Sequence, residues 1–233
     1  MTDGFSNFTP GAFQFLVDLA LNNDRSWFQP RKGDYERLLK EPLEALCVAL
    51  AAEFEERSIP LSADPGRSPF RIYRDVRFSK DKSPYKTAVS ASFPWAGDGG
   101  GVGGYLSLQP GQCYVGGGMW HPVPARLAAW RVRVVEDRAA IHAVVDAPAF
   151  RAEFGGVSGN QLKRGPTGFA PDDPDIELLK LKDVTFGRTM TDAEAGSANL
   201  PAELAATFAK AIPLLGLLAA LPGNDEPASW LRG

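Results

Sequence analysis

The sequence predicts an α+β fold in which an antiparallel β-meander is flanked by N-terminal and C-terminal helices. Apolar residues recur with helical spacing before residue 57 and after residue 124, whereas residues 70–116 alternate with the period of strands. An apolar content of 44% with 23% charged residues is ordinary for a globular domain. No internal repeat or linker divides the 233 residues, so we expect a single domain over residues 1–233.

Two helical segments are expected before the strands. Thr9-Pro10 combines a helix cap with a proline in the first turn, and the apolar residues that follow keep helical spacing up to Asn22-Asn23. A second helical segment covers roughly residues 34–57. Pro42 should kink or split that segment near Lys40, because proline lacks an amide hydrogen.

The central segment predicts four strands joined by short connections, which is typical of an antiparallel meander. In the first strand Ile72, Val76 and Phe78 should face inward, and Arg74 falls on the same side. The glycines between the second and third strands match GxGxxG by letter. They lie between two strands, so we interpret them as a hairpin loop and not as a dinucleotide site. The expected strands are residues 70–78, 87–93, 105–109 and 112–116.

Helices are expected again after the meander, and the alternation of residues 184–190 is compatible with one further strand. Asp173-Pro174 repeats the pattern of a cap followed by proline. Pro213 should interrupt the last helix. The expected helices are residues 124–134, 138–145, 148–154, 173–181 and 201–221.

Positive charge is concentrated in one short segment of an acidic chain. Residues 67–86 contain seven basic and two acidic residues, a net charge of +5 in a chain of net charge −3, so the remainder carries −8. This distribution argues against nucleic-acid binding over the whole surface. If Arg74 shares the apolar side of its strand, it must meet a carboxylate or line a pocket that holds an anion, because guanidinium groups are rarely buried unpaired.

We interpret the cationic segment as a binding site for a small molecule that carries phosphate or carboxylate. Arginine would supply bidentate contacts, lysine point charges and serine hydrogen bonds. If the site is catalytic, Tyr85 is the candidate acid or base, because neighbouring cations favour its phenolate. The candidate ligand-binding residues are Arg71, Arg74, Arg77, Ser79, Lys80, Lys82, Ser83 and Lys86.

The alternative is a solvated loop in a non-enzymatic structural or protein-interaction module, where the cations pair with surface acids or with an acidic partner. The discriminating feature is geometric, since cations that converge on a concave surface favour a binding site. The sequence leaves open whether the protein is an enzyme, and it indicates no oligomeric state.

Three further segments are weaker candidates. Trp27 and Phe28, with Arg31 and Lys32, either form a binding loop or seal the end of the helical pair, and we favour the second interpretation. His121 belongs to no metal-binding pattern, and neither does the other histidine, so we expect no metal and no cofactor. The third set could complete the anion site: Lys163, Arg164, Lys180 and Lys182.

The cellular setting is expected to be cytoplasmic. Cys47 and Cys113 stand in apolar surroundings without CxxC spacing, and we interpret both as reduced packing residues. The start MTDGFSNFTP lacks the basic and apolar regions of a secretory signal. No run approaches the roughly 20 apolar residues of a membrane helix, so no membrane association is expected.

With these motifs, the chain resembles the uncharacterised bacterial and fungal proteins grouped as domain of unknown function 2461. The resemblance implies a single domain of about this length, and it points to no particular activity. At position 31 the family more often has asparagine, and this departure puts any role of Arg31 itself in doubt. The segments that carry the resemblance are residues 22–35, RIYRDVRFSKDKSPYKT at 71–87, GGGMWHP at 116–122 and LKRGPTGFAPDDPDIELLKLK at 162–182.

Overall fold

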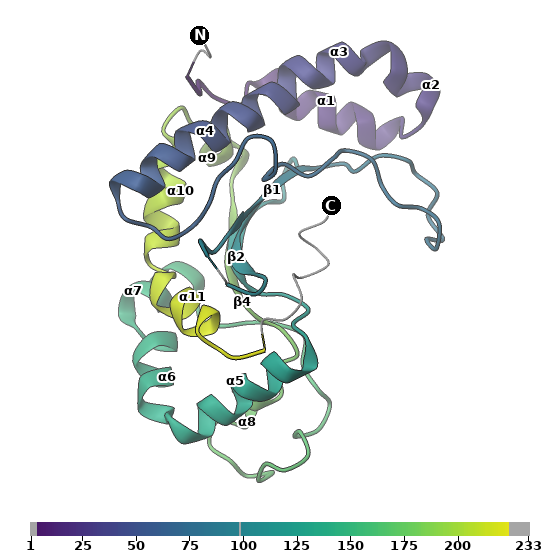
Figure 1. The fold of residues 1–233 in the computed structure, drawn as a ribbon. Helices are drawn as coiled ribbons and strands as arrows, with labels where there is room; N and C mark the ends of the chain where they lie inside the picture. Colours follow the sequence, from purple (N-terminus) through teal and green to yellow (C-terminus); the bar gives the residue numbers. More distant parts are fainter. Residues whose placement is uncertain (1–3, 98, 224–233) are drawn as a thin grey trace.

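An antiparallel sheet forms the centre of the computed structural model, which describes residues 4–97 and 99–223 (Figure 1). Its four strands lie side by side in the order in which they follow along the chain. The α+β class and the antiparallel meander between flanking helices are therefore confirmed. The strands are β1 (Val89–Pro94), β2 (Val102–Leu108), β3 (Cys113–Met119) and β4 (Val184–Met190).

The meander is displaced by one strand from the prediction. Residues 70–78, expected as the first strand, make one isolated bridge, from Tyr73 to Tyr85, whereas the segment proposed as a further strand is β4 and pairs with β3. Beyond Ile72 the chain leaves the sheet and pairs only with its own return, so alternation there has no core to face. Phe78 was expected to point inward and is instead 96% exposed.

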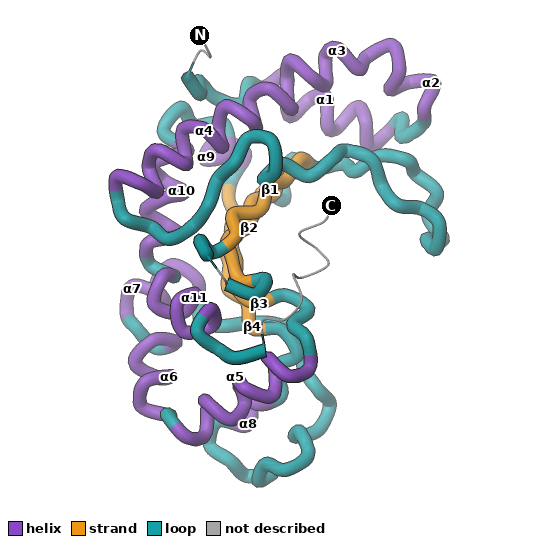
Figure 2. Tube along the Cα trace, viewed as in Figure 1, coloured by secondary structure: helices purple, strands orange, loops and turns teal. Residues whose placement is uncertain are grey.

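One face of the sheet is covered by helices α4 (Glu41–Glu56), α7 (Pro148–Phe154), α10 (Leu200–Ala209) and α11 (Ile212–Ala219) (Figures 1 and 2). Phe54 of α4, Phe93 of β1 and Phe208 of α10 meet edge to face there, with ring centroids 5.7–6.0 Å apart. Such contacts bury large apolar areas in preferred aromatic geometry. This layer fixes which side of each strand belongs to the core.

The opposite side of the strands, which we call the open face, is only half-buried. In β2, Leu106 and Leu108 are buried against the helices, whereas Tyr105 and Ser107 alternate with them and lie on the open face. The register places Ser90 of β1 opposite Ser107 on that face. A polar row therefore crosses the first two strands.

The N-terminal helices lie at the β1 end of the sheet (Figure 1). They comprise α1 (Pro10–Leu21), α2 (Arg25–Phe28), a 3₁₀ turn (Gln29–Arg31), α3 (Lys32–Tyr35) and a π-helical turn (Glu36–Lys40) that leads into α4. The break expected at Pro42 is present, since α4 has that proline in its first turn and the π-helical turn precedes it.

The C-terminal part contains α5 (Pro124–Glu136), α6 (Arg138–Val145), α8 (Ile176–Leu179) and α9 (Asp192–Ala195) in addition to α7, α10 and α11. The expected helices are all present, although α8 is shorter than predicted. The break at Pro213 separates α10 from α11. Helix α9 was not predicted, and its start is set by a capping box between Thr191 and Glu194.

Hydrogen-bonded ion pairs tie α6 to the segment before α8. The ring nitrogens of His142 lie 2.6 Å from an Asp146 oxygen and 2.8 Å from an Asp175 oxygen. Arg138 also pairs with Asp175 and with Asp173. The bonds to Asp146 and Asp175 raise the pKa of His142, so its charged form stabilises this junction.

Both cysteines are buried and free, as predicted, and burial raises the pKa of the Cys47 thiol to about 12 and that of the Cys113 thiol to about 11. Among the described residues, no single helix has the length and apolar character needed to cross a membrane. The pair α10 and α11, bent by 60°, reaches that criterion only jointly and only by length and composition.

Candidate functional site

Residues 71–87 form an arm that projects from the sheet edge and returns directly into β1 (Figures 1 and 2). Its two sides are held together at the base. The Arg74 amide donates to the Pro84 carbonyl at 2.9 Å, the Lys86 amide donates to the Ile72 carbonyl at 2.7 Å, and Tyr73 bridges to Tyr85. The tip of the arm, residues 75–82, has no such ladder.

Asn23, just after α1, anchors the arm. Its Nδ2 donates to the Tyr85 carbonyl and its Oδ1 accepts from the Tyr85 amide, both at 3.0 Å, so the side chain imitates a neighbouring strand. The Tyr85 ring stacks on Phe28 with centroids 4.1 Å apart. Two hydrogen bonds and one stacked pair therefore set the position of the residues that flank Tyr85.

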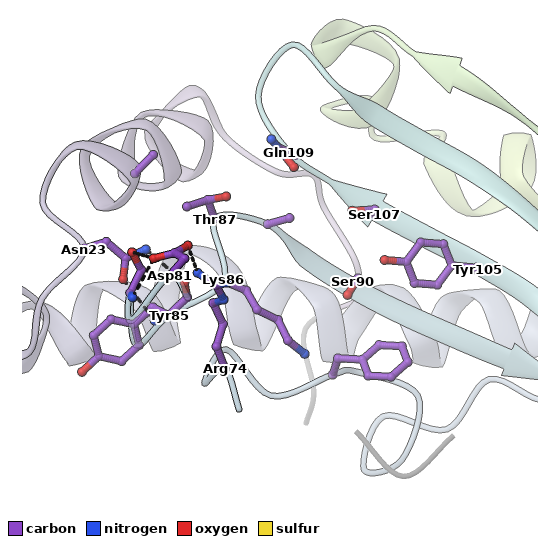
Figure 3. Close-up of a pocket in the computed structure, with 14 residues that line it drawn as sticks. Asn23, Arg74, Asp81, Tyr85, Lys86, Thr87, Ser90, Tyr105, Ser107 and Gln109 are labelled. Atoms are coloured by element: carbon purple, nitrogen blue, oxygen red, sulfur yellow. Dashed lines mark hydrogen bonds and ion pairs between the residues drawn. The ribbon is translucent and has the colours of Figure 1, made fainter. Parts of the chain in front are cut away.

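A hollow of about 620 Å³ lies between the arm, the end of α1 and the open face of the sheet, and we call it the anion pocket (Figure 3). Its lining holds two cations and one carboxylate, with hydroxyl and amide groups around them. The charged and polar residues that line it are Asn23, Arg74, Asp81, Ser83, Tyr85, Lys86, Thr87, Ser90, Tyr105, Ser107 and Gln109.

Arg74 has a carboxylate partner inside the pocket. Its guanidinium forms an ion pair with Asp81, which also accepts hydrogen bonds from the Ser83 hydroxyl at 2.6 Å and the Ser83 amide at 2.9 Å. The bond from the Ser83 hydroxyl, followed by that from Arg74, lowers the pKa of Asp81. The partner that the sequence analysis required for Arg74 is therefore Asp81.

Lys86 is the cation that the pocket leaves without a counter-charge. Its side chain extends from the arm toward the open face (Figure 3), and its Nζ lies 5.1 Å from the centroid of the Phe70 ring. The ion pairs among the described residues do not include Lys86. Burial, and then the charge of Arg71, lower the pKa of Lys86. The folded protein therefore holds this positive charge against both desolvation and repulsion.

The remaining cations of the arm lie outside the pocket. Arg77 pairs with Asp75 at 2.7 Å, and Lys82 donates to the Val76 carbonyl at 2.9 Å. The predicted set thus divides between the base and the tip of the arm. Arg74, Ser83 and Lys86 line the anion pocket, whereas Arg71, Arg77, Ser79, Lys80 and Lys82 do not.

Tyr85 contributes mainly its backbone to the pocket. The ring is 1% exposed and turns away from the polar row of the sheet (Figure 3), and its buried hydroxyl has no hydrogen-bond partner among the described residues. This placement gives the ring a packing role. The acid–base role of Tyr85 stays a prediction to which the pocket geometry adds no support.

Sequence patterns did not indicate several of the pocket residues. Asp81 contributes to the net charge of its segment, and Asn23 lies in the Asn22-Asn23 pair that ends a helix, but neither pattern points to a binding site. Ser90, Tyr105 and Ser107 could have been found from strand alternation, because they occupy the positions between the inward residues. No sequence pattern indicated that the open face would lie beside the arm.

The weaker candidates have separate outcomes. Phe28 is fully buried and Trp27 packs on Phe15 with centroids 5.5 Å apart, which confirms that these rings seal the helical pair. The second set of cations does not complete the anion pocket: Lys163 and Arg164 line one separate hollow, and Lys182 lines another with His121. The described residues contain no cluster of three His, Cys, Asp or Glu side chains that could hold a metal.

A family model described as "Conserved hypothetical protein (DUF2461)" matches residues 11–216. Comparisons with curated proteins and with solved structures found no match.

Proposed function

The chain belongs to this DUF2461 family, and because the family description names no activity, we propose from the pocket geometry that the protein binds a small anionic ligand. The ligand carries a phosphate or carboxylate group, and its negative charge lies at Lys86. Arg74 remains with Asp81 and forms the wall of the pocket, while hydroxyls of the arm and sheet supply hydrogen bonds.

The observation that carries this proposal is the half-buried ammonium of Lys86. Buried charges in folded proteins are normally paired, because removing a charge from water costs several kcal/mol (on the order of 5) when nothing compensates it. The Phe70 ring offsets only part of that cost, since a cation–π contact contributes about 0.5–2 kcal/mol. An anion bound beside Lys86 supplies the missing charge.

The polar groups of the pocket fit an oxyanion. Ser90 and Ser107 line it together with Gln109, and hydroxyl and amide donors of this kind bind phosphate and carboxylate oxygens. The other cations of the arm do not line the pocket, and they have no part in the proposed binding.

The test is thermal unfolding of the wild type and two variants with phosphate, sulfate, carboxylates and nucleotides at fixed ionic strength. Lys86→Met removes the pocket cation. Lys80→Met removes the same charge from the exposed tip and is the matched control. We expect one class of anion to stabilise the wild type and Lys80→Met but not Lys86→Met. Equal responses of all three proteins would reject the pocket as the binding site.

A second candidate function rests on the tip of the arm. Phe78 is almost fully exposed, and the Arg77 guanidinium lies 5.9 Å from the centroid of its ring. An exposed aromatic ring among cations favours contact with an acidic protein partner. In that case a cell-extract protein should bind the wild type, and Phe78→Ala should lose the partner while keeping its response to anions.

A cytoplasmic location accords with the proposed role. Cys47 and Cys113 are both free, and unpaired thiols persist in a reducing compartment. Detection of the protein in an exported fraction of its source cells would contradict this location.

A further inference from the structure

A second hollow, of about 480 Å³, adjoins the anion pocket on the open face, and we call it the ring hollow. The two share Phe70 and Tyr105, so one ligand can extend from the first into the second. Among the described residues, none that lines the ring hollow is charged. Its lining residues are Phe70, Gly103, Tyr105, Tyr114, Gly117, Gly118, Trp120 and Thr185.

The floor of the ring hollow is bare backbone, for a structural reason. A Cβ on Gly103 would overlap the carbonyl oxygen of Phe93 in β1, and a Cβ on Gly118 would overlap that of Val184 in β4. Gly118 also has a φ of +123°, which side chains rarely adopt. Close packing of neighbouring strands therefore demands glycine at these two positions, and no side chain covers the open face there.

Aromatic rings stand around this floor in succession from the anion pocket. Lys86 Nζ lies 5.1 Å from the Phe70 centroid, Phe70 lies 6.2 Å from Tyr105, and Tyr105 lies 6.5 Å from Tyr114. Trp120 at the end of β3 is 43% exposed. These contacts continue the aromatic lining from Lys86 in the anion pocket into the ring hollow.

The polar capacity of the ring hollow is small. The Tyr114 hydroxyl already donates to the Phe186 carbonyl at 3.2 Å, and among the other lining residues only Tyr105 and Thr185 carry a side-chain hydroxyl. A carbohydrate ring would need several hydrogen-bond partners for its hydroxyls. A planar aromatic ring needs few, because stacking on tyrosine or tryptophan provides most of its binding energy.

We propose that the ligand is an aromatic ring joined to an anionic group, with the ring held in the ring hollow and the anion at Lys86. This inference rests on the proposed function and specifies its substrate class. The cationic end sets the position of the anion, and the glycine floor with Tyr105 and Trp120 selects a flat group.

The experiment is calorimetric titration of the full chain with ring-bearing and ring-free phosphates. The ring-bearing probes are phenyl phosphate and the four nucleoside 5′-monophosphates, and the ring-free probes are ribose 5-phosphate and inorganic phosphate. We expect at least one ring-bearing probe to bind roughly 5- to 100-fold more tightly than ribose 5-phosphate, the gain expected from stacking one ring.

Two variants test whether the additional affinity of ring-bearing phosphates arises in the ring hollow. Trp120→Ala should remove most of it and leave the affinity for ribose 5-phosphate unchanged. Phe78→Ala removes an exposed aromatic ring from the arm tip, outside both hollows, and should change neither affinity.

The outcomes separate the two proposals. Equal affinity for ring-bearing and ring-free phosphates, both dependent on Lys86, would overturn the ring hollow and keep the anion pocket. Absence of Lys86-dependent binding for every probe would overturn both. An equal loss for all probes in Trp120→Ala would contradict a ring-specific role for that side chain.

Discussion

Replacement of Lys86 by methionine separates a binding cation from a structural one. Methionine keeps the length and apolar character of the side chain and removes its charge. Because Lys86 has no carboxylate partner among the described residues, its removal relieves an uncompensated desolvation cost, and we expect the unfolding free energy without ligand to equal or exceed that of the wild type. Loss of one partner from a buried ion pair would instead cost about 3–5 kcal/mol.

The effect should appear once an anion is present. A ligand at 100 times its Kd adds about 2.7 kcal/mol to stability. A charge-assisted hydrogen bond contributes about 1.5–3 kcal/mol, so Lys86→Met should weaken binding roughly 10- to 100-fold. At the same ligand concentration the added stability then falls to about 0.4–1.4 kcal/mol.

The assay is thermal unfolding with and without the anion. For a chain of 233 residues, each kcal/mol corresponds to about 2–4 °C in Tm, so a ligand-induced shift of about 5–11 °C should fall to about 1–6 °C in the variant. A variant that loses stability without ligand, or that keeps the full ligand-induced shift, would contradict the role of Lys86 as the binding cation. The first result would make Lys86 a structural residue, and the second would place the anion elsewhere.

Four further variants test the surroundings of the pocket. Asn23→Ala removes both side-chain bonds to the Tyr85 backbone and should lower the unfolding free energy in urea by about 1–3 kcal/mol and weaken anion binding; unchanged stability would show that the arm does not depend on this anchor. Tyr85→Phe removes a buried hydroxyl that lacks a partner among the described residues and should leave stability equal or up to about 1 kcal/mol higher, with anion affinity unchanged; lost affinity would return the hydroxyl to the site. Gly103→Ala forces a Cβ against the Phe93 carbonyl of the neighbouring strand and should cost about 3 kcal/mol or more by urea unfolding, and a fully stable variant would contradict the packing of the open face. For His142, hydrogen bonds to Asp146 and Asp175 raise the pKa above its ordinary 6.5, so its stabilising effect is complete below that value and is lost as the pH rises through the higher folded pKa. The unfolding free energies of the wild type and His142→Gln should therefore converge as the pH rises above 6.5, and a constant difference would contradict a role for the charged ring.

Most helices and strands could be predicted because residues within each one indicate its type and its ends. Proline placed the start of α1 and the breaks before α4 and α11, since a missing amide hydrogen acts wherever the proline stands. The meander followed from alternation and short connections. Helix α9 could have been found as well, because Thr191 and Glu194 have the spacing of a capping box.

The strand expected at residues 70–78 shows where local rules end. Its alternation is genuine, and Ile72 is buried, yet a strand forms only where a neighbour supplies hydrogen bonds. The arm has such a neighbour at Tyr73 and Tyr85 and none at Phe78. Period-two alternation therefore predicted a strand at residues 70–78, but no neighbouring strand is present to pair with its second half.

The sequence predicted which segment contributes to the pocket, but it did not predict which cations of that segment line it. Charge concentration selected the correct segment, and Arg74, Ser83 and Lys86 do line a pocket. The sequence treated all arm cations as equivalent, because the separation of base from tip depends on Asn23, 62 residues away from Tyr85. The aromatic surroundings of the ring hollow come from three separate parts of the chain, so no single motif could indicate them.

The most direct test of the anion pocket is a titration of backbone amide chemical shifts with inorganic phosphate at constant ionic strength. We expect saturable shifts confined to residues that line the pocket, in the segments 83–90 and 105–109, and their loss in Lys86→Met. Shifts that never saturate, or that are largest at the exposed tip of the arm, would contradict a specific site and leave the cationic segment as solvated surface.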